Sequence, residues 1–240
     1  MTLLLLAGTR EAREIAKALV AEGVPATASL AGVTREPTEL AIPTRVGGFG
    51  GRDGFRSYLK ENDITAVLDA THPFAHSISN RSAEICSEQT IPYCQLLRAA
   101  WDPEPNWHML SREEDAAALV QPGETVFLAT GRQTLGRFEN MAHARVICRQ
   151  IDPPEAPFPF PNGHYHVAKP PFSEEDEYQL FKDLKVDWLI AKNAGGNSSR
   201  TKLDAAKRLN LNVALLERPA QPEGCKAESV EEALAWVQSL

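Results

Sequence analysis

The chain has 240 residues, 43% of them hydrophobic and 24% charged, with a formal net charge of −7 at pH 7. This composition indicates a globular protein with a sizeable core, and the acidic balance argues against general nucleic-acid or anionic-membrane binding. The apolar run at residues 3–6 is too short for a membrane span or signal peptide. The four cysteines (Cys86, Cys94, Cys148 and Cys225) form no Cys-x-x-Cys pair, so we expect free thiols in a cytoplasmic protein.

Strand-like and helix-like segments alternate along the chain. The first helix is predicted to begin after Thr9, its N-cap, and to end near Gly23. Strands are expected at residues 3–7, 26–30, 44–46, 66–70, 93–97, 107–110, 126–130, 144–149, 188–192 and 213–216. The helices expected between and after them include residues 77–89, 113–120, 132–140, 174–184, 199–209 and 230–237.

This alternation predicts an α/β protein with parallel sheets covered by helices on both faces. The strands fall into two similar sets, which suggests two small doubly wound lobes. We place the boundary near Pro103 and Pro105, with residues 1–100 as the N-terminal lobe and 101–240 as the C-terminal lobe.

Ligands of doubly wound sheets bind outside the carboxyl ends of the strands, so the residues after each strand are the candidates. Gly8-Thr9-Arg10-Glu11 opens a helix, whose N-terminus suits a phosphate, although the turn lacks the Gly-x-Gly-x-x-Gly fingerprint and could be only a tight turn. The segment from Ser29 to Arg35 carries hydroxyls and an arginine where an NAD-binding fold usually has an acid. It is either a site for the 2′-phosphate of NADPH or a polar loop with an incidental arginine.

Two more loops belong to this predicted edge. Residues 47–51 include four glycines, which allow another molecule to approach the backbone closely or simply form a mobile turn. The next strand ends in Asp69-Ala70-Thr71-His72-Pro73-Phe74. His72 could orient a nicotinamide or move a proton, or it could be a structural histidine bonded to a backbone carbonyl.

The second half offers two similar sites. Thr130-Gly131-Arg132 follows a strand and opens a helix, so the same preference for anions applies. Lys192-Asn193-Ala194-Gly195-Gly196 also follows a strand, and Lys202 lies in the next helix. A lysine, an amide and two glycines together favour a carboxylate or phosphate site over solvated charges.

Taken in order, these motifs resemble the precorrin-6A reductase family of cobalamin biosynthesis across the whole chain. The matching segments include the turn at Gly8, residues 47–51, the stretch from Asp69 to Ala75, Gly131-Arg132-Gln133 and the stretch from Lys192 to Gly196. The resemblance implies two Rossmann-like lobes with the ligands between them. It also implies NADPH-dependent reduction of one ring double bond of precorrin-6A to give precorrin-6B.

The resemblance and the loop positions together assign the site residues. We expect NADPH to contact Gly8, Thr9, Arg10, Glu11, Ser29, Leu30, Ala31, Gly32, Arg35, Gly48 and Thr71. We expect the polycarboxylate tetrapyrrole to contact Phe74, Gly131, Arg132, Lys192, Asn193, Gly195, Gly196 and Lys202. His72 is the candidate proton donor, and no metal site is expected. The alternatives are a cobalt-precorrin-6A reductase, a tetrapyrrole methyltransferase and a non-catalytic NADPH-binding protein.

Overall fold

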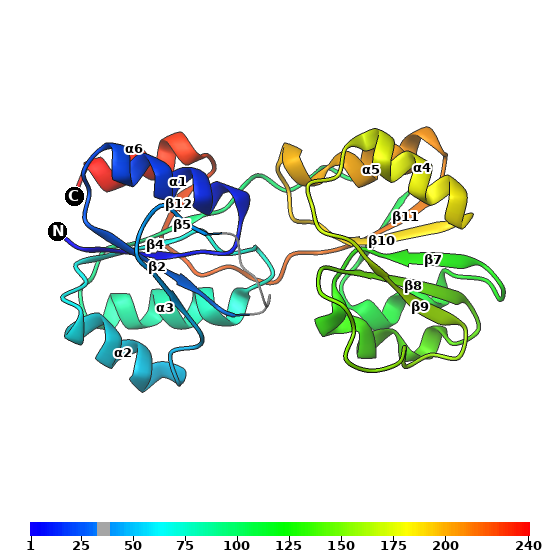
Figure 1. Ribbon diagram of the computed structural model, residues 1–240, viewed down its shortest axis with the longest axis horizontal. Coiled ribbons are helices and arrows are strands. Elements are labelled where there is room, and N and C mark those ends of the chain that lie inside the picture. Colours follow the sequence, from blue (N-terminus) through cyan, green and yellow to red (C-terminus); the bar gives the residue numbers. More distant parts are fainter. Residues whose placement is uncertain (33–38) are drawn as a thin grey trace. The chain divides into compact units, whose positions relative to one another are not determined.

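The computed structural model describes residues 1–32 and 39–240, with Ser198 described by its backbone alone. The chain forms two compact units (Figure 1), one of Met1–Ala99 with Pro219–Leu240 and the other of Ala100–Arg218. Within the described residues each unit contains one six-stranded sheet, and all the strand pairs are parallel. The predicted α/β fold with two parallel-sheet lobes is confirmed.

The sheet of the first unit has the strand order β3-β2-β1-β4-β5-β12. Its strands are β1 (Leu3–Leu6), β2 (Ala26–Leu30), β3 (Thr44–Val46), β4 (Ala66–Asp69), β5 (Tyr93–Leu96) and β12 (Cys225–Ala227). Its helices are α1 (Arg10–Ala21), α2 (Gly51–Glu61), α3 (His76–Glu88) and α6 (Val230–Gln238). Helices α1 and α6 pack together on one face of the sheet, and α2 and α3 pack on the other (Figure 1).

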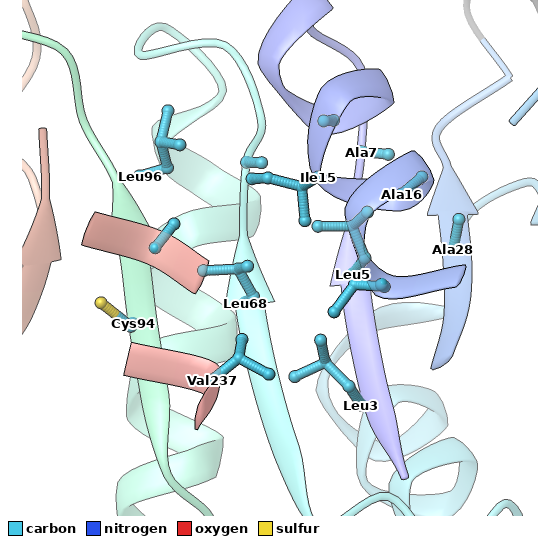
Figure 2. Close-up of a cluster of buried hydrophobic side chains, with 14 of the residues drawn as sticks. Leu3, Leu5, Ala7, Ile15, Ala16, Ala28, Leu68, Cys94, Leu96 and Val237 are labelled. Carbon is cyan, nitrogen blue, oxygen red and sulfur yellow. The ribbon is translucent and has the colours of Figure 1, made fainter. Parts of the chain in front are cut away.

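The leucine run of β1 explains why this sheet is buried on both faces. Leu3 and Leu5 pack with Ile15 of α1 and Val237 of α6 (Figure 2), whereas Leu4 and Leu6 face α2 and α3. Successive side chains of a strand point to opposite faces, so a central strand between two helical layers needs apolar residues at every position.

The sheet of the second unit has the order β9-β8-β7-β10-β11-β6. Its strands are β6 (Trp107–Leu110), β7 (Thr125–Leu128), β8 (Arg145–Gln150), β9 (Gly163–Val167), β10 (Trp188–Lys192) and β11 (Asn212–Leu216). Helices α4 (Glu174–Leu184) and α5 (Thr201–Arg208) pack together, as do the 3₁₀ helices η1 (Glu113–Ala118) and η2 (Arg132–Met141). A short 3₁₀ helix, η3 (Asn197–Ser199), precedes α5.

The second unit is one continuous segment, whereas the first unit takes its sixth strand from the part of the chain that follows the second unit. β6 comes directly after β5 in sequence but pairs with β11, whereas β12 comes after β11 and pairs with β5. The assignment of residues 101–240 to one lobe is therefore wrong for residues 219–240. The physical reason is burial, because Ala227, Ala233 and Val237 complete the core of the first unit against α1 and β5.

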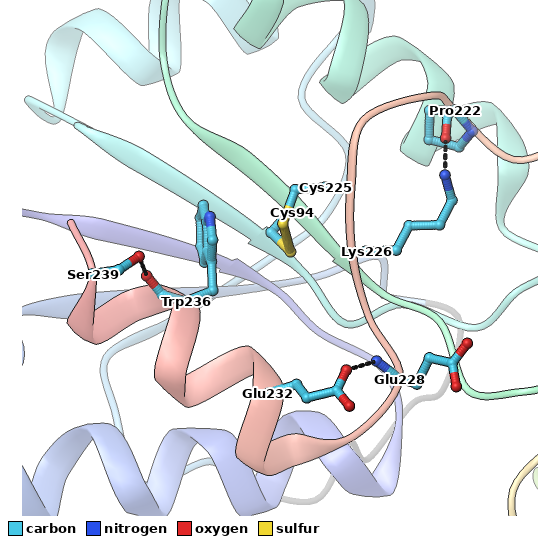
Figure 3. Close-up of a disulfide and its surroundings, with 8 residues drawn as sticks. All are labelled: Cys94, Pro222, Cys225, Lys226, Glu228, Glu232, Trp236 and Ser239. Atoms are coloured by element: carbon cyan, nitrogen blue, oxygen red, sulfur yellow. Dashed lines mark hydrogen bonds between the residues drawn. A yellow bond between two sulfur atoms is a disulfide. The ribbon is translucent and has the colours of Figure 1, made fainter.

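The expectation of four free thiols is also corrected. Cys94 of β5 and Cys225 of β12 lie opposite each other on neighbouring strands and form a disulfide (Figure 3). Cys86 and Cys148 are free and buried, and burial raises the pKa of each thiol to about 12. The disulfide therefore ties the returning C-terminal strand covalently to the first sheet.

Candidate functional site

The carboxyl edge of the first sheet gathers the residues predicted to bind the cofactor. Leu6 lies opposite Ser29 on one side and Asp69 on the other, so β1, β2 and β4 end at the same level. The loops that begin at Gly8, Leu30 and Thr71 consequently leave the sheet side by side. This is the switch point between β1 and β4, where doubly wound sheets bind their ligands.

Thr9 holds two of these loops together. Its hydroxyl donates to the carbonyl of Ala70 at 2.8 Å and accepts from the backbone N–H of Ala12 at 3.2 Å, which confirms it as the N-cap of α1. The hydroxyl is therefore occupied within the protein. What the turn offers a phosphate is the set of backbone N–H groups in the first turn of α1.

The side chains of Arg10 and Glu11 also have partners in the first unit. Arg10 pairs with Glu14 one helical turn later, at 2.8 Å on the surface. Glu11 accepts from Arg98 at 2.6 Å, and both of these side chains are largely buried. Because both side chains already have partners, we expect the backbone of this turn, and not the two side chains, to contact the cofactor.

Arg45 is a candidate that the sequence analysis missed. It lies opposite Ser29 in the β2–β3 register and donates to the Ser29 hydroxyl at 2.7 Å. Its other donations go to the carbonyls of Gly47 and Gly48, and its guanidinium lies 4.1 Å from the ring centre of Phe49. No carboxylate among the described residues pairs with Arg45. Arg35, the arginine expected here, lies outside the described residues.

The backbones after β2 and β3 approach each other closely. Gly32 has a φ of +77°, and a Cβ at this position would lie 3.3 Å from Cγ1 of Val46. The N–H of Gly47 donates to the carbonyl of Leu30 at 2.9 Å. Ala31, Gly32 and Gly48 are exposed, so this edge presents mostly backbone next to the Arg45 charge.

Asp69 fixes the loop that carries Thr71 and His72. Its fully buried carboxylate accepts from the N–H of Thr71 at 3.0 Å and from the hydroxyl of Tyr93 at 2.7 Å. Burial, with the adjacent Asp69 charge, raises the pKa of the Tyr93 phenol far above its usual range, so Tyr93 stays a donor. The N–H of Phe74 donates to Nδ1 of the exposed His72 at 3.2 Å, which places the proton of neutral His72 on Nε2.

In the second unit, the loop after β10 is held by Trp101. The side-chain amide of Asn193 accepts from the N–H of Trp101 at 2.9 Å and donates to its carbonyl at 3.0 Å. The indole N–H of Trp101 donates to the carbonyl of Gly196 at 3.0 Å. Gly195 and Gly196 have φ values of +67° and +75°, which other residues rarely adopt. Asn193 therefore shapes the glycine turn, and any contact that it makes with a ligand is additional.

Lys192 and Lys202 lie on opposite faces of the second sheet. Burial lowers the pKa of Lys192, and its charged neighbours are Glu113 of η1 and Arg137 of η2. Lys202 lies on α5, where its ammonium donates to the carbonyl of Ser199 and lies 5.6 Å from the ring centre of Trp101. Lys192 and Lys202, both predicted to contact the tetrapyrrole, thus lie on different sides of the sheet.

Lys202 adjoins a buried ion pair that the sequence analysis also missed. Arg149 donates to both carboxylate oxygens of Glu177, at 2.8 and 2.9 Å, and Glu177 is only 2% exposed. Burial lowers the pKa of Lys202 to about 8; Arg149 lowers it further and Glu177 opposes the shift. Only the β8–α4 packing reveals this cluster, because the two residues are 28 positions apart.

The other predicted substrate residues occupy separate places in the fold. Gly131, with a φ of +80°, caps η2, and Arg132 is exposed in its first turn. Phe74 belongs to the first unit, with its ring 5.8 Å from that of His72. Across residues 1–32 and 39–240, no group of three His, Cys, Asp or Glu side chains could hold a metal ion. In the same part of the chain, no helix has the length and apolar character needed to cross a membrane.

Comparisons with known proteins match the whole chain. The model of the family described as "Precorrin-6x reductase CbiJ/CobK" matches residues 2–238. A precorrin-6A reductase of Rhodococcus erythropolis is 38% identical over 243 residues, which cover 99% of this chain and 98% of the relative. A cobalt-precorrin-6A reductase of Priestia megaterium is 28% identical over 244 residues, with 96% and 95% covered. A solved structure described as "CobK precorrin-6A reductase" superposes with a TM-score of 0.95 at 35% identity, covering 100% of this chain and 96% of its own.

Proposed function

The chain belongs to the precorrin-6x reductase family, and from this premise we propose that it reduces one ring double bond of precorrin-6A with NADPH, giving precorrin-6B in cobalamin biosynthesis. The observation that carries the choice of cofactor is Arg45, whose guanidinium bonds Ser29 at the end of β2. We propose the metal-free substrate because the relative named for it is 38% identical, whereas the relative named for the cobalt form is 28% identical.

The first unit has the features that a dinucleotide requires. The first-turn N–H groups of α1 would hold the pyrophosphate, and Ser29 with Arg45 would hold the 2′-phosphate. A Cβ at Gly8 or Gly48 would meet nothing within 4 Å, so a ligand can approach the backbone there. Bound NADPH would supply the hydride, while the protein supplies position and electrostatics.

The remaining candidate residues would bind the substrate and supply the proton. Lys192, Lys202 and Arg132 would attract the carboxylates of the tetrapyrrole, which an acidic protein must bind with a few local cations. His72 would deliver the proton as the imidazolium, protonated on both ring nitrogens, a form in which its Nδ1 no longer accepts the N–H of Phe74. Asp69 acts through the backbone of Thr71 and orients this loop.

Replacing Arg45 with alanine is expected to weaken NADPH binding while leaving NADH binding unchanged. A charge-assisted hydrogen bond contributes about 1.5–3 kcal/mol, which corresponds to roughly a tenfold to hundredfold change in affinity. Fluorescence titration with NADPH and with NADH measures the ratio of the two affinities. Arg56→Ala is the matched control, because Arg56 pairs with Asp53 on α2 and with Glu88 on α3. An equal loss for both cofactors would mean that Arg45 only supports the Gly47–Gly48 loop.

The proposed reaction is tested directly with NADPH deuterated at nicotinamide C4. We expect deuterium on a carbon of the macrocycle after incubation with precorrin-6A, without added flavin or metal. Parallel incubation with the cobalt-containing macrocycle tests the alternative substrate. Deuterium lost to solvent, or a requirement for flavin, would contradict direct hydride transfer.

A further inference from the structure

Three neighbouring strands of the second sheet end in a row of polar side chains. In the β7–β10 register Leu128 lies opposite Ile190, and in the β7–β8 register Leu128 lies opposite Cys148. Continued two residues past the end of β7, this register would place Thr130 between Lys192 and Gln150. The chain still follows β10 beyond β7, because the N–H of Ala129 donates to the carbonyl of Ile190 at 2.9 Å. Neighbouring strands are about 4.8 Å apart, so the row is compact.

The row points to the face covered by η1 and η2. Phe127, Ile147 and Leu189 pack against α4 and α5 on the other face. Side chains alternate along a strand, so Gln150 and Lys192, three positions after Ile147 and Leu189, have the opposite orientation. The same alternation, continued past the end of β7, would give Thr130 this orientation too. The charged neighbours of Lys192, Glu113 of η1 and Arg137 of η2, agree with this placement.

Two members of this row are buried without hydrogen-bond partners. Thr130 is 6% exposed and Gln150 is 5% exposed. Within the described residues, the Thr130 hydroxyl and both amide atoms of Gln150 lack a partner, as does the hydroxyl of Thr134 in the first turn of η2. A buried polar group without a partner destabilises a protein, so native structures keep few of them.

We infer that Thr130, Gln150 and Lys192, with the N-terminal turn of η2, form an oxyanion subsite that takes one carboxylate of the tetrapyrrole. The inference rests on the proposed function for the identity of that ligand. The Thr130 hydroxyl, the Gln150 amide nitrogen and the first-turn N–H groups of η2 are all donors, and Lys192 supplies the charge. Its ammonium has three donors and can serve both the carboxylate and the amide oxygen of Gln150. Arg132 and Gln133 are exposed, so the turn borders solvent.

Two near-isosteric substitutions, Thr130→Val and Gln150→Met, test the subsite. Each is expected to raise the dissociation constant of precorrin-6A about tenfold or more, as for the loss of a hydrogen bond to a charged group. The thermal midpoint should stay the same or rise, because each substitution removes a group that has no partner in the free protein. Thr125→Val is the matched control on the same strand, since Thr125 is 7% exposed but lies at the other end of β7. This control should leave precorrin-6A binding unchanged.

The remaining outcomes overturn the inference in different ways. Lower thermal midpoints with unchanged precorrin-6A affinity would assign the row to buried structural water. A selective loss of NADPH affinity would assign it to a phosphate of the cofactor instead. Wild-type protein that binds no precorrin-6A would overturn the proposed function along with the subsite. Normal wild-type binding that neither substitution weakens would overturn the subsite alone.

Discussion

Replacing Glu177 with alanine is expected to lower the free energy of unfolding of the second unit by about 3–5 kcal/mol. Glu177 is 2% exposed and holds Arg149 through two hydrogen bonds. Without this carboxylate, Arg149 and the nearby ammonium of Lys202 would be left as buried cations with no anion between them. Urea unfolding followed by tryptophan fluorescence measures the loss.

Two controls separate this effect from a general weakening of α4. Glu175 lies on α4 with Glu177 but is exposed, and it pairs with Arg208 of α5. Glu175→Ala should therefore lower the free energy of unfolding by only about 0–1 kcal/mol. The double variant Arg149→Met with Glu177→Leu should regain much of the lost stability, because apolar residues of similar size can replace a buried pair. A loss below about 1 kcal/mol for Glu177→Ala would show that water reaches the pair.

Replacing Lys202 with methionine is expected to stabilise the second unit by about 1–3 kcal/mol at pH 7 and to weaken tetrapyrrole binding. The pKa of Lys202 is about 8 in the folded protein, below its ordinary value of 10.5, chiefly because of burial. Keeping this lysine charged therefore destabilises the fold at neutral pH. That cost disappears as the pH rises from about 8 to 10.5, where the folded protein releases the proton before the unfolded chain does. The stability difference between variant and wild type should shrink over this range.

Lys207→Met is the matched control for this experiment. Lys207 lies on the same helix, is 62% exposed and pairs with Glu104 at 2.8 Å. Its replacement should change stability by less than about 1 kcal/mol and leave tetrapyrrole affinity unchanged. A Lys202→Met variant that is less stable at every pH would show that the ammonium supports the fold. Unchanged tetrapyrrole affinity would remove Lys202 from the substrate site.

The central strands were predicted from their continuous apolar runs. β1, β4, β7 and β10 lie between two helical layers, and every residue of the first three is buried. The two missed strands, β9 and β12, are edge strands with mostly exposed or half-buried residues. Neither has a continuous apolar run, although the other two edge strands, β3 and β6, were predicted at residues 44–46 and 107–110. The segments expected as helices at residues 113–120 and 132–140 are 3₁₀ helices, and η2 is kinked at Phe138.

The candidate site likewise has parts that the sequence could locate and parts that only the packing reveals. The loops after β1, β2, β4, β7 and β10 could be located from the sequence, because strand ends follow from local patterns. Arg45 was overlooked because it lies within a strand, and only the β2–β3 register places it against Ser29. The face on which Lys192 or Lys202 lies likewise depends on how strands and helices pack.

By itself, the sequence determined that this protein alternates strands and helices in two parallel sheets, and which loops end at the ligand-binding edges. These properties depend on residues close together in the chain: apolar runs, helix caps and glycine turns. Only the tertiary structure decided that β12 returns to the first sheet, that Arg149 and Glu177 form a buried pair, and that Thr130 and Gln150 are buried without partners among the described residues. Each of these depends on contacts between segments far apart in sequence, which are selected by the burial that the whole unit gains and not by any local pattern.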